Sequence, residues 1–203
     1  MLATAAVLTP AHAGSKLGRV RRARPDVRGL LAVLDRFGVE YVVTGSVAAL
    51  LLGVSLEPGD LDVTPAPEPE NLERLARALA DLEARQYLDE PFGRWTTEAN
   101  GERRWVTFEP TEADRQARAT WNPDPSDLDS FDHLLWTRLG TLDVVPEIAG
   151  SYDDLRHRAR AVEVDGRTVA VESICDQLAT LTIPRREKDR QRVSALRALQ
   201  RKG

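Results

Sequence analysis

Three aspartates with apolar neighbours are the residues of this chain best suited to chemistry. Asp60 and Asp62 are separated by one leucine, and because strand side chains alternate between two faces, both carboxylates should point the same way. Asp143 stands in a similar setting, with an apolar residue on each side. A buried carboxylate is costly unless a positive group meets it. Carboxylate oxygens suit a hard divalent cation, so the three acids predict a metal site.

A glycine–serine pair precedes these acids and offers a second kind of chemistry. Gly45 and Ser46 follow an apolar, β-branched stretch, and thirteen residues separate Ser46 from Asp60. A helix that begins at such a turn leaves backbone N–H groups free to bind a phosphate. The pair and the acids together predict a site for a divalent cation and a phosphate.

The elements that must position these residues alternate between strands and helices. Apolar residues at helical spacing, capping residues and a glycine stop predict helices at residues 26–37, 46–52, 71–88, 151–159, 173–182 and 186–199. Apolar and β-branched runs predict strands at residues 39–44, 61–63, 141–145, 162–164 and 168–171. Strands and helices in this order predict an α/β or α+β core.

The middle of the chain has a weaker pattern. Residues 95–97 and 103–108 flank Asn100-Gly101, a dipeptide suited to a tight hairpin turn. Residues 109–132 are polar and contain prolines, which predicts loops and one short helix.

Composition excludes several classes of protein. With 42% hydrophobic and 30% charged residues, a chain of 203 residues can bury a core, which excludes global disorder. Cys175 is alone, which excludes a disulfide-stapled fold and favours the cytoplasm. No apolar run is long enough to cross a bilayer, so no membrane partner is expected. We expect a flexible basic leader at 1–25, a core at 26–150, and a C-terminal hairpin and helices at 151–203.

Charge is unevenly distributed along the chain. Residues 31–183 hold 14 basic and 29 acidic side chains, a net charge of -15, whereas residues 1–30 carry +5 and residues 184–203 carry +6, which together give the total of -4. An acidic body repels nucleic acid unless metal ions or the basic ends intervene.

The acids and the glycine–serine pair resemble the minimal nucleotidyltransferases related to DNA polymerase β. That family has a hydrophobic strand followed by Gly with Gly or Ser, then Asp-x-Asp or Asp-x-Glu, and a third acid on a later strand. This chain has the matching segments at residues 42–46, 60–63 and 142–144. The resemblance implies a nucleotidyltransferase fold, with a mixed β-sheet core flanked by helices and a C-terminal helical segment.

The C-terminal part is similar to AbiEii-like and MenT-like toxins of bacterial toxin–antitoxin pairs. Asp176 heads a predicted helix, and an Arg-x-Lys-Asp sequence follows it at residues 186–189. The resemblance covers about residues 28–200. Two positions depart from it: Leu181 stands where many relatives have a lysine, and Pro58 stands where many have Thr or Ser.

The resemblance implies a metal-dependent nucleotidyl transfer with a role for each matching residue. Asp60 and Asp62 would hold two Mg²⁺ or Mn²⁺ ions, and Asp143 would bind one of them and act or assist as base. Gly45 and Ser46 would contact the phosphates of a nucleoside triphosphate. In the Arg-x-Lys-Asp sequence, Arg186 and Lys188 would neutralise charge as pyrophosphate leaves. Asp189 would orient Lys188 or contact the base or sugar of the nucleotide.

The resemblance also implies an acceptor and a protein partner. We expect a toxin that adds nucleotides to an RNA 3′ end, most simply the acceptor end of tRNA, and that a cognate antitoxin silences. The basic ends would attract the RNA, and Arg103-Arg104 beside Trp105 is a candidate acceptor surface. Transfer to a small molecule such as an aminoglycoside, or to a protein hydroxyl, is an alternative. An inactive nucleotide-binding module is a third.

Overall fold

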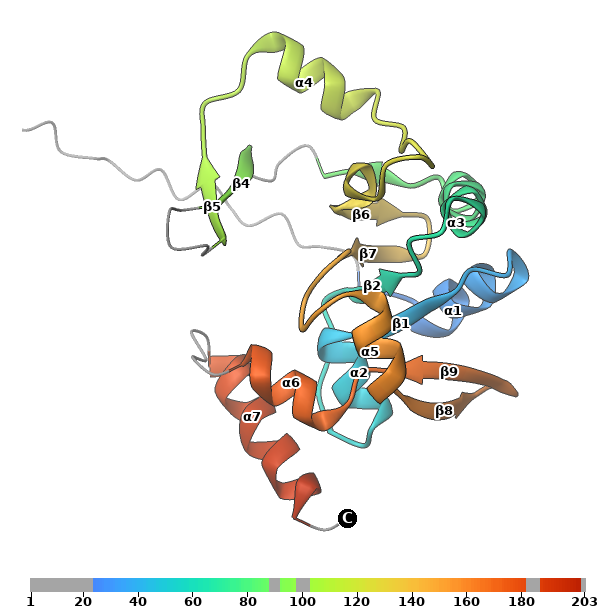
Figure 1. Ribbon diagram of the computed structural model, residues 1–203, viewed down its shortest axis with the longest axis vertical. Helices are drawn as coiled ribbons and strands as arrows, with labels where there is room; N and C mark the ends of the chain where they lie inside the picture. Colours follow the sequence, from blue (N-terminus) through green and yellow to red (C-terminus); the bar gives the residue numbers. More distant parts are fainter. Residues whose placement is uncertain (1–23, 88–91, 98–102, 182–186, 202–203) are drawn as a thin grey trace, which may run out of the picture.

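The computed structural model describes residues 24–87, 92–97, 103–181 and 187–201 of the chain. Within these ranges, seven strands form one mixed sheet in the order β3-β6-β7-β2-β1-β9-β8 (Figure 1). The bounds are β1 (Tyr41–Thr44), β2 (Leu61–Pro65), β3 (Arg85–Gln86), β6 (His133–Thr137), β7 (Gly140–Val144), β8 (Arg160–Val164) and β9 (Arg167–Val171). The β2–β7 and β1–β9 pairs are parallel and the others are antiparallel.

Helices flank this sheet, so the predicted mixed β-sheet core with flanking helices and a C-terminal helical segment is confirmed. The helices are α1 (Val27–Arg36), α2 (Gly45–Leu51), α3 (Pro69–Asp81), α4 (Glu112–Ala119), α5 (Tyr152–Arg158), α6 (Ile174–Thr180) and α7 (Glu187–Gln200). In Figure 1, α6 and α7 lie together beside α2, at the end of the molecule away from α4. The predicted leader falls mostly on residues 1–23, which are outside the described residues.

Local sequence explains where the first helix begins and ends. Asp26 caps α1 by accepting a hydrogen bond from the backbone N–H of Gly29 at 3.0 Å. The leucines of the inward face are buried, and Gly38, at a φ of 66°, turns the chain away from the helix. The predicted helix at residues 26–37 is therefore confirmed to within a residue at each end.

The predicted helix at residues 71–88 is wrong at both ends. Pro69, which fits the first turn because it lacks an N–H group, begins α3 earlier than expected. Asp81 ends it, since Glu83 adopts a left-handed conformation at a φ of 53°. Two residues later the chain forms β3, the outer strand of the sheet on the side of β6.

Sequence reasoning also missed a strand in the middle segment. Residues 133–137 form β6, which pairs along its whole length with β7. Before it, α4 starts with a reciprocal capping box between Thr111 and Asp114, and a short 3₁₀ helix, η1, spans Leu128–Phe131. The predicted hairpin is confirmed as β4 (Gly93–Thr97) paired with β5 (Arg103–Thr107), while its Asn100-Gly101 turn lies outside the described residues.

The two faces of the sheet differ, and this difference positions the acids. One face packs against α1, α2 and α3 through alternate residues of the strands: Val43, Leu61, Val63, Leu142, Val144, Val169 and Val171. The opposite face is partly covered by α5, whose Tyr152 and Leu155 pack against Val42. Residues 44, 62 and 143 alternate with the core residues, so they point to this second face. Nearby, α6 and α7 pack against α2 through a smaller apolar cluster that contains Leu196.

Candidate active site

Asp62 and Asp143 are neighbours across two parallel strands. The β2–β7 register pairs Asp62 with Asp143, and the buried pairs Leu61–Leu142 and Val63–Val144 flank them. Paired residues in adjacent strands point to the same face, so the two carboxylates lie side by side. Asp60 lies just before β2 and raises the pKa of Asp62 electrostatically, as does Asp143. The structure thus places Asp62 and Asp143 side by side, with Asp60 close enough to Asp62 for their charges to interact.

Burial and like charge make the Asp62 carboxyl hard to ionise. Loss of solvent contact raises its pKa well above the usual value, and the negative charges of Asp60 and Asp143 raise it further. The Arg192 guanidinium and a hydrogen bond from the Ser46 N–H group oppose this rise. A cation placed among the three carboxylates would therefore relieve a cost that the fold carries.

The glycine–serine turn lies against the same carboxylate. Thr44, the last residue of β1, is the register partner of Asp62, and the helix that follows begins at Gly45, one residue earlier than predicted. Gly45 has a φ of 65°, and a Cβ atom on it would lie 2.7 Å from the carboxyl carbon of Asp62. Only glycine fits this close approach. The Ser46 Oγ atom is buried and has no hydrogen-bond partner among the described residues.

Glu172 is a residue of this site that sequence reasoning missed. It follows β9 directly, and its side chain is 1% exposed. Its Oε2 atom accepts a hydrogen bond from the Gly45 N–H group at 3.1 Å, and its own N–H group donates to the Val43 carbonyl at 2.8 Å. Burial raises the pKa of Glu172 to about 7. The one sequence signal for Glu172 was its position as a single acid directly after an apolar strand. A single acid in that position forms no motif, so it did not identify Glu172 as a site residue.

Arg192 is the second residue that was missed. It lies on α7, is partly buried, and its positive charge lowers the pKa of both Asp62 and Glu172. These effects place the guanidinium near both carboxyl groups. In the sequence Arg192 is one of eight basic residues between positions 184 and 203, so type and spacing did not distinguish it.

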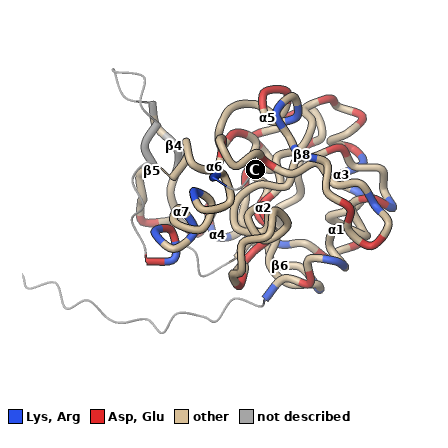
Figure 2. Tube along the Cα trace, turned by 90° about the horizontal axis from the view of Figure 1, so that it is seen from below, with Lys and Arg blue, Asp and Glu red and all other residues tan. Residues whose placement is uncertain are grey.

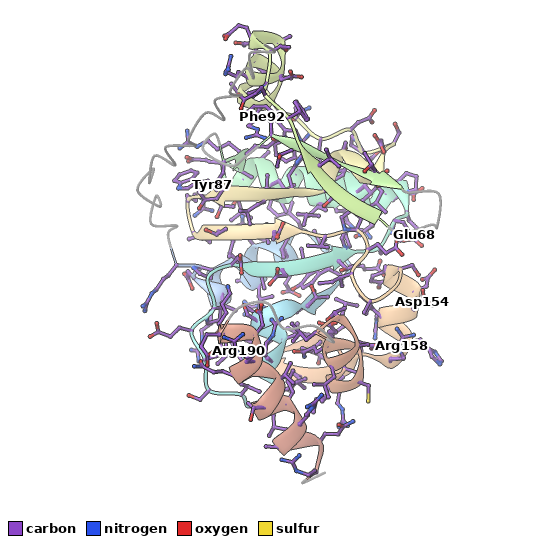
Figure 3. The ribbon with its side chains drawn as sticks, turned by 90° about the vertical axis from the view of Figure 1, so that its left-hand side faces the viewer. Glu68, Tyr87, Phe92, Asp154, Arg158 and Arg190 are labelled. Carbon is purple, nitrogen blue, oxygen red and sulfur yellow. The ribbon has the colours of Figure 1, made fainter. Side chains whose placement is uncertain are left out.

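The C-terminal residues predicted for the site differ in their exposure to solvent. Lys188 is exposed at the start of α7, whereas Asp189 beside it is 6% exposed. Arg186 lies outside the described residues. Asp176, the head of α6, pairs with Arg158 at 2.9 Å and so connects α6 to α5, where Figure 3 labels Arg158. Residues 103–105 form the start of β5. The candidate acceptor surface at these residues stays a prediction.

A pre-formed metal cage is absent from the described residues: no three His, Cys, Asp or Glu side chains are arranged to hold an ion there. Mg²⁺ in nucleotide sites usually takes only one or two protein carboxylates, with substrate phosphates and water completing its shell. Asp62 and Asp143, adjacent and with oxygen donors only, fit that smaller requirement. The residues therefore suit Mg²⁺ bound together with a nucleotide better than Mg²⁺ bound alone.

Two surface hollows lie away from the acids. One, of about 200 Å³, is lined by the start of β1, α5 and the β8–β9 hairpin. The other, of about 310 Å³, runs along the outer side of α7 and is lined by Arg190, Val193, Ser194, Arg197 and Arg201. Figure 2 shows basic positions on α7, and Figure 3 labels Arg190 there. The basic outer side of α7 is thus distinct from the side that bears Arg192.

None of the helices in the described ranges is long and apolar enough to cross a membrane.

Comparison with known proteins gives a distant structural likeness. No protein-family model matches the chain, and no curated protein matches it significantly. A crystal structure from Thermotoga maritima, described as a putative nucleotidyltransferase, is similar over 87% of this chain and 91% of that chain, with 19% sequence identity and a TM-score of 0.45. A likeness of this size carries no conclusion about activity.

Proposed function

We propose that this protein transfers a nucleoside monophosphate from a nucleoside triphosphate to a hydroxyl acceptor. The observation that carries the proposal is the pairing of Asp62 with Asp143 on adjacent parallel strands, with Asp60 nearby. The Gly45 turn, which lies against the Asp62 carboxyl, supports it. Adjacent carboxylates beside the buried Ser46 hydroxyl, which has no partner among the described residues, suit a substrate that carries metal-bound phosphates.

In the proposed reaction, the acceptor oxygen forms a bond to the α-phosphorus of the triphosphate. The bond between the α-phosphorus and the oxygen that bridges to the β-phosphorus breaks, and pyrophosphate leaves with that electron pair. The acceptor hydroxyl proton passes to the Asp143 carboxylate, which faces the second side of the sheet. Bound Mg²⁺, or Mn²⁺, held by Asp60, Asp62 and Asp143 would neutralise phosphate charge and acidify the hydroxyl.

The chain's other residues bind and orient the substrate in this proposal. The Ser46 hydroxyl, buried and without a partner among the described residues, donates to a phosphate oxygen. Gly45 lets the backbone approach the carboxylates closely. The resemblance assigns neutralisation of the departing pyrophosphate to Arg186 and Lys188, and it gives Asp189 the orientation of Lys188 or contact with the base or sugar.

For the acceptor we propose an RNA 3′ end, most simply that of tRNA. The support is electrostatic: the basic C-terminal segment, including the outer side of α7, offers attraction that the acidic body lacks. The toxin role, with an antitoxin as partner in the cytoplasm, rests on the sequence resemblance alone. The net charge of -15 on residues 31–183 favours a second candidate, a cationic small-molecule acceptor such as an aminoglycoside.

One assay tests the reaction and separates the acceptors. Purified protein is incubated with each α-³²P-labelled nucleoside triphosphate and Mg²⁺, in parallel with total tRNA, with an aminoglycoside, and with no added acceptor. Label on RNA supports the RNA acceptor, label on the aminoglycoside supports the second candidate, and label on the protein itself indicates a protein hydroxyl. Absence of label on every acceptor, with nucleotide bound, would show an inactive binding module and contradict the proposal.

A further inference from the structure

We propose that Arg192 is the cation that binds the departing phosphates of the triphosphate, in a polar pocket that it forms with Ser46 and Glu172. The inference rests on the proposed function, because it assigns a residue to the pyrophosphate end of the same site. It also replaces an expectation from the sequence, which gave this role to Lys188 and Arg186.

Unpaired polar atoms gather around the Gly45 turn. In the described ranges, seven buried side-chain nitrogen and oxygen atoms lack a hydrogen-bond partner. Three belong to the turn or to Glu172, which bonds to it: Thr44 Oγ1, Ser46 Oγ and Glu172 Oε1. Two more, Gln177 Oε1 and Arg192 Nε, belong to side chains that interact with Glu172. Gln177 belongs to the group because its amide donates to the Glu172 carbonyl at 3.3 Å. The hydroxyls of Thr44 and Ser46 and the Arg192 Nε–H group can donate, whereas the Glu172 and Gln177 oxygens accept. Each buried unpaired polar group costs about 1–3 kcal/mol, so the three donors point to an absent acceptor.

The donors in this cluster define the chemistry of that ligand. The Arg192 Nε–H group and the Ser46 hydroxyl can both donate, and no described residue accepts from the Arg192 Nε atom. A guanidinium binds a phosphate through two or more N–H groups at once, and each of these hydrogen bonds is charge-assisted. A phosphate oxyanion would satisfy both donors at once.

Packing holds Arg192 in this position. Leu196, one turn further along α7, is fully buried in the cluster that joins α7 to α2 through Ala49. This contact fixes α7 against α2, the helix that begins at the turn. Arg192 acts electrostatically on Asp62 and Glu172, while Arg190, Arg197 and Arg201 line the outer hollow. Lys188, by contrast, is exposed.

Glu172 acts as a positioning residue for the same pocket. Its Oε2 atom holds the Gly45 N–H group, and its carboxyl also lies close enough to Arg192 for the two charges to interact. The carboxyl therefore keeps the turn in place and attracts the guanidinium to it before phosphate arrives.

The test measures binding of inorganic pyrophosphate, with and without Mg²⁺, by isothermal titration calorimetry. We expect Arg192→Ala to weaken binding at least tenfold and Arg192→Lys, which keeps the charge but not the guanidinium, to weaken it less. Arg197→Ala, a matched loss of one arginine from the outer side of α7, should bind pyrophosphate as the wild type does. Arg192→Gln serves in place of Arg192→Ala if urea unfolding shows that the alanine variant does not fold.

Three results would overturn the inference: no pyrophosphate binding by the wild type, equal losses in Arg192→Ala and Arg197→Ala, or a loss in Lys188→Ala that Arg192→Ala does not share. Transfer kinetics separate this inference from the proposed function. Pyrophosphate binding that depends on Arg192, without nucleotidyl transfer to any acceptor, would retain the pocket and remove the reaction. Transfer with unchanged kcat and KM in Arg192→Ala would retain the reaction and remove the pocket.

Discussion

Asp62 and Asp143 occupy matching positions on two neighbouring parallel strands, although 80 residues of chain separate them. The apolar pairs on either side of them belong to the main core, so the packing that stabilises the sheet also fixes the distance between the two carboxylates. This arrangement concentrates negative charge at one place on the second face of the sheet. The fold therefore bears an electrostatic cost where the proposed chemistry needs a cation.

Replacing Asp62 by asparagine should raise the stability of the fold but lower the transfer activity. Burial and the charges of Asp60 and Asp143 raise the pKa of Asp62, so the fold favours its neutral form. Asp62→Asn mimics that form and should raise the midpoint of urea unfolding at pH 8 while lowering transfer at least 100-fold. The control is Asp81→Asn, because hydrogen bonds from Arg138 and Arg36 lower the pKa of Asp81 and its neutralisation should reduce stability. A fall in stability in Asp62→Asn as well would contradict this explanation.

Gly45→Ala should inactivate the protein by moving the Asp62 carboxyl. The backbone conformation disfavours any side chain there by about 1–2 kcal/mol, and the new Cβ atom would collide with Asp62. Displacement of a reacting group by about 1 Å can cost about 100-fold in rate. Gly166→Ala is the control, since Gly166 has a similar φ of 76° and no atom lies within 4 Å of its Cβ position. Gly45→Ala should lose at least as much stability as Gly166→Ala in urea unfolding, because the collision adds to the backbone strain, but only Gly45→Ala should lose transfer. Equal activities would rule out the collision as the cause.

Glu172 should make stability depend on pH in a defined window. Its pKa is about 7 in the fold against an ordinary value of 4.5. Because the folded-state value is the higher one, the stability that this carboxyl contributes is fully present below about pH 4.5 and is lost as the pH rises through 7. The slope for one group is at most about 1.4 kcal/mol per pH unit. Glu172→Gln keeps an acceptor for the Gly45 N–H group and should flatten this part of the curve of unfolding free energy against pH. Parallel curves for the two proteins between pH 4.5 and 7 would show that Glu172 does not titrate there.

Much of the fold follows from local signals in the sequence. The Asp26 cap, the leucines of α1 and the alternation around Asp62 each act within a few residues, so they were readable without tertiary contacts. The end of α3 could not be predicted in this way, because the apolar pattern continues to residue 88 while the left-handed conformation of Glu83 stops the helix. Strand β6 owes its form to pairing with β7, a contact that no local periodicity encodes.

The same distinction applies to the candidate site. The three acids and the Gly45–Ser46 pair were found because spacing and flanking residues mark them. Glu172 and Arg192 were missed because their importance comes from position: one follows an ordinary strand, and the other is one basic residue among several on a helix. Only the pairing of β9 with β1 and the packing of α7 on α2 bring them to the turn.

The most direct measurement is the single-turnover rate of nucleotidyl transfer in a double-mutant cycle of Asp62→Asn and Asp143→Asn, with urea unfolding as the check on the fold. Groups that act as one unit give single losses about as large as the double loss. The account predicts that each single variant folds, loses at least 100-fold in transfer, and loses little more when the two changes are combined. Folded single variants that transfer at the wild-type rate would contradict it.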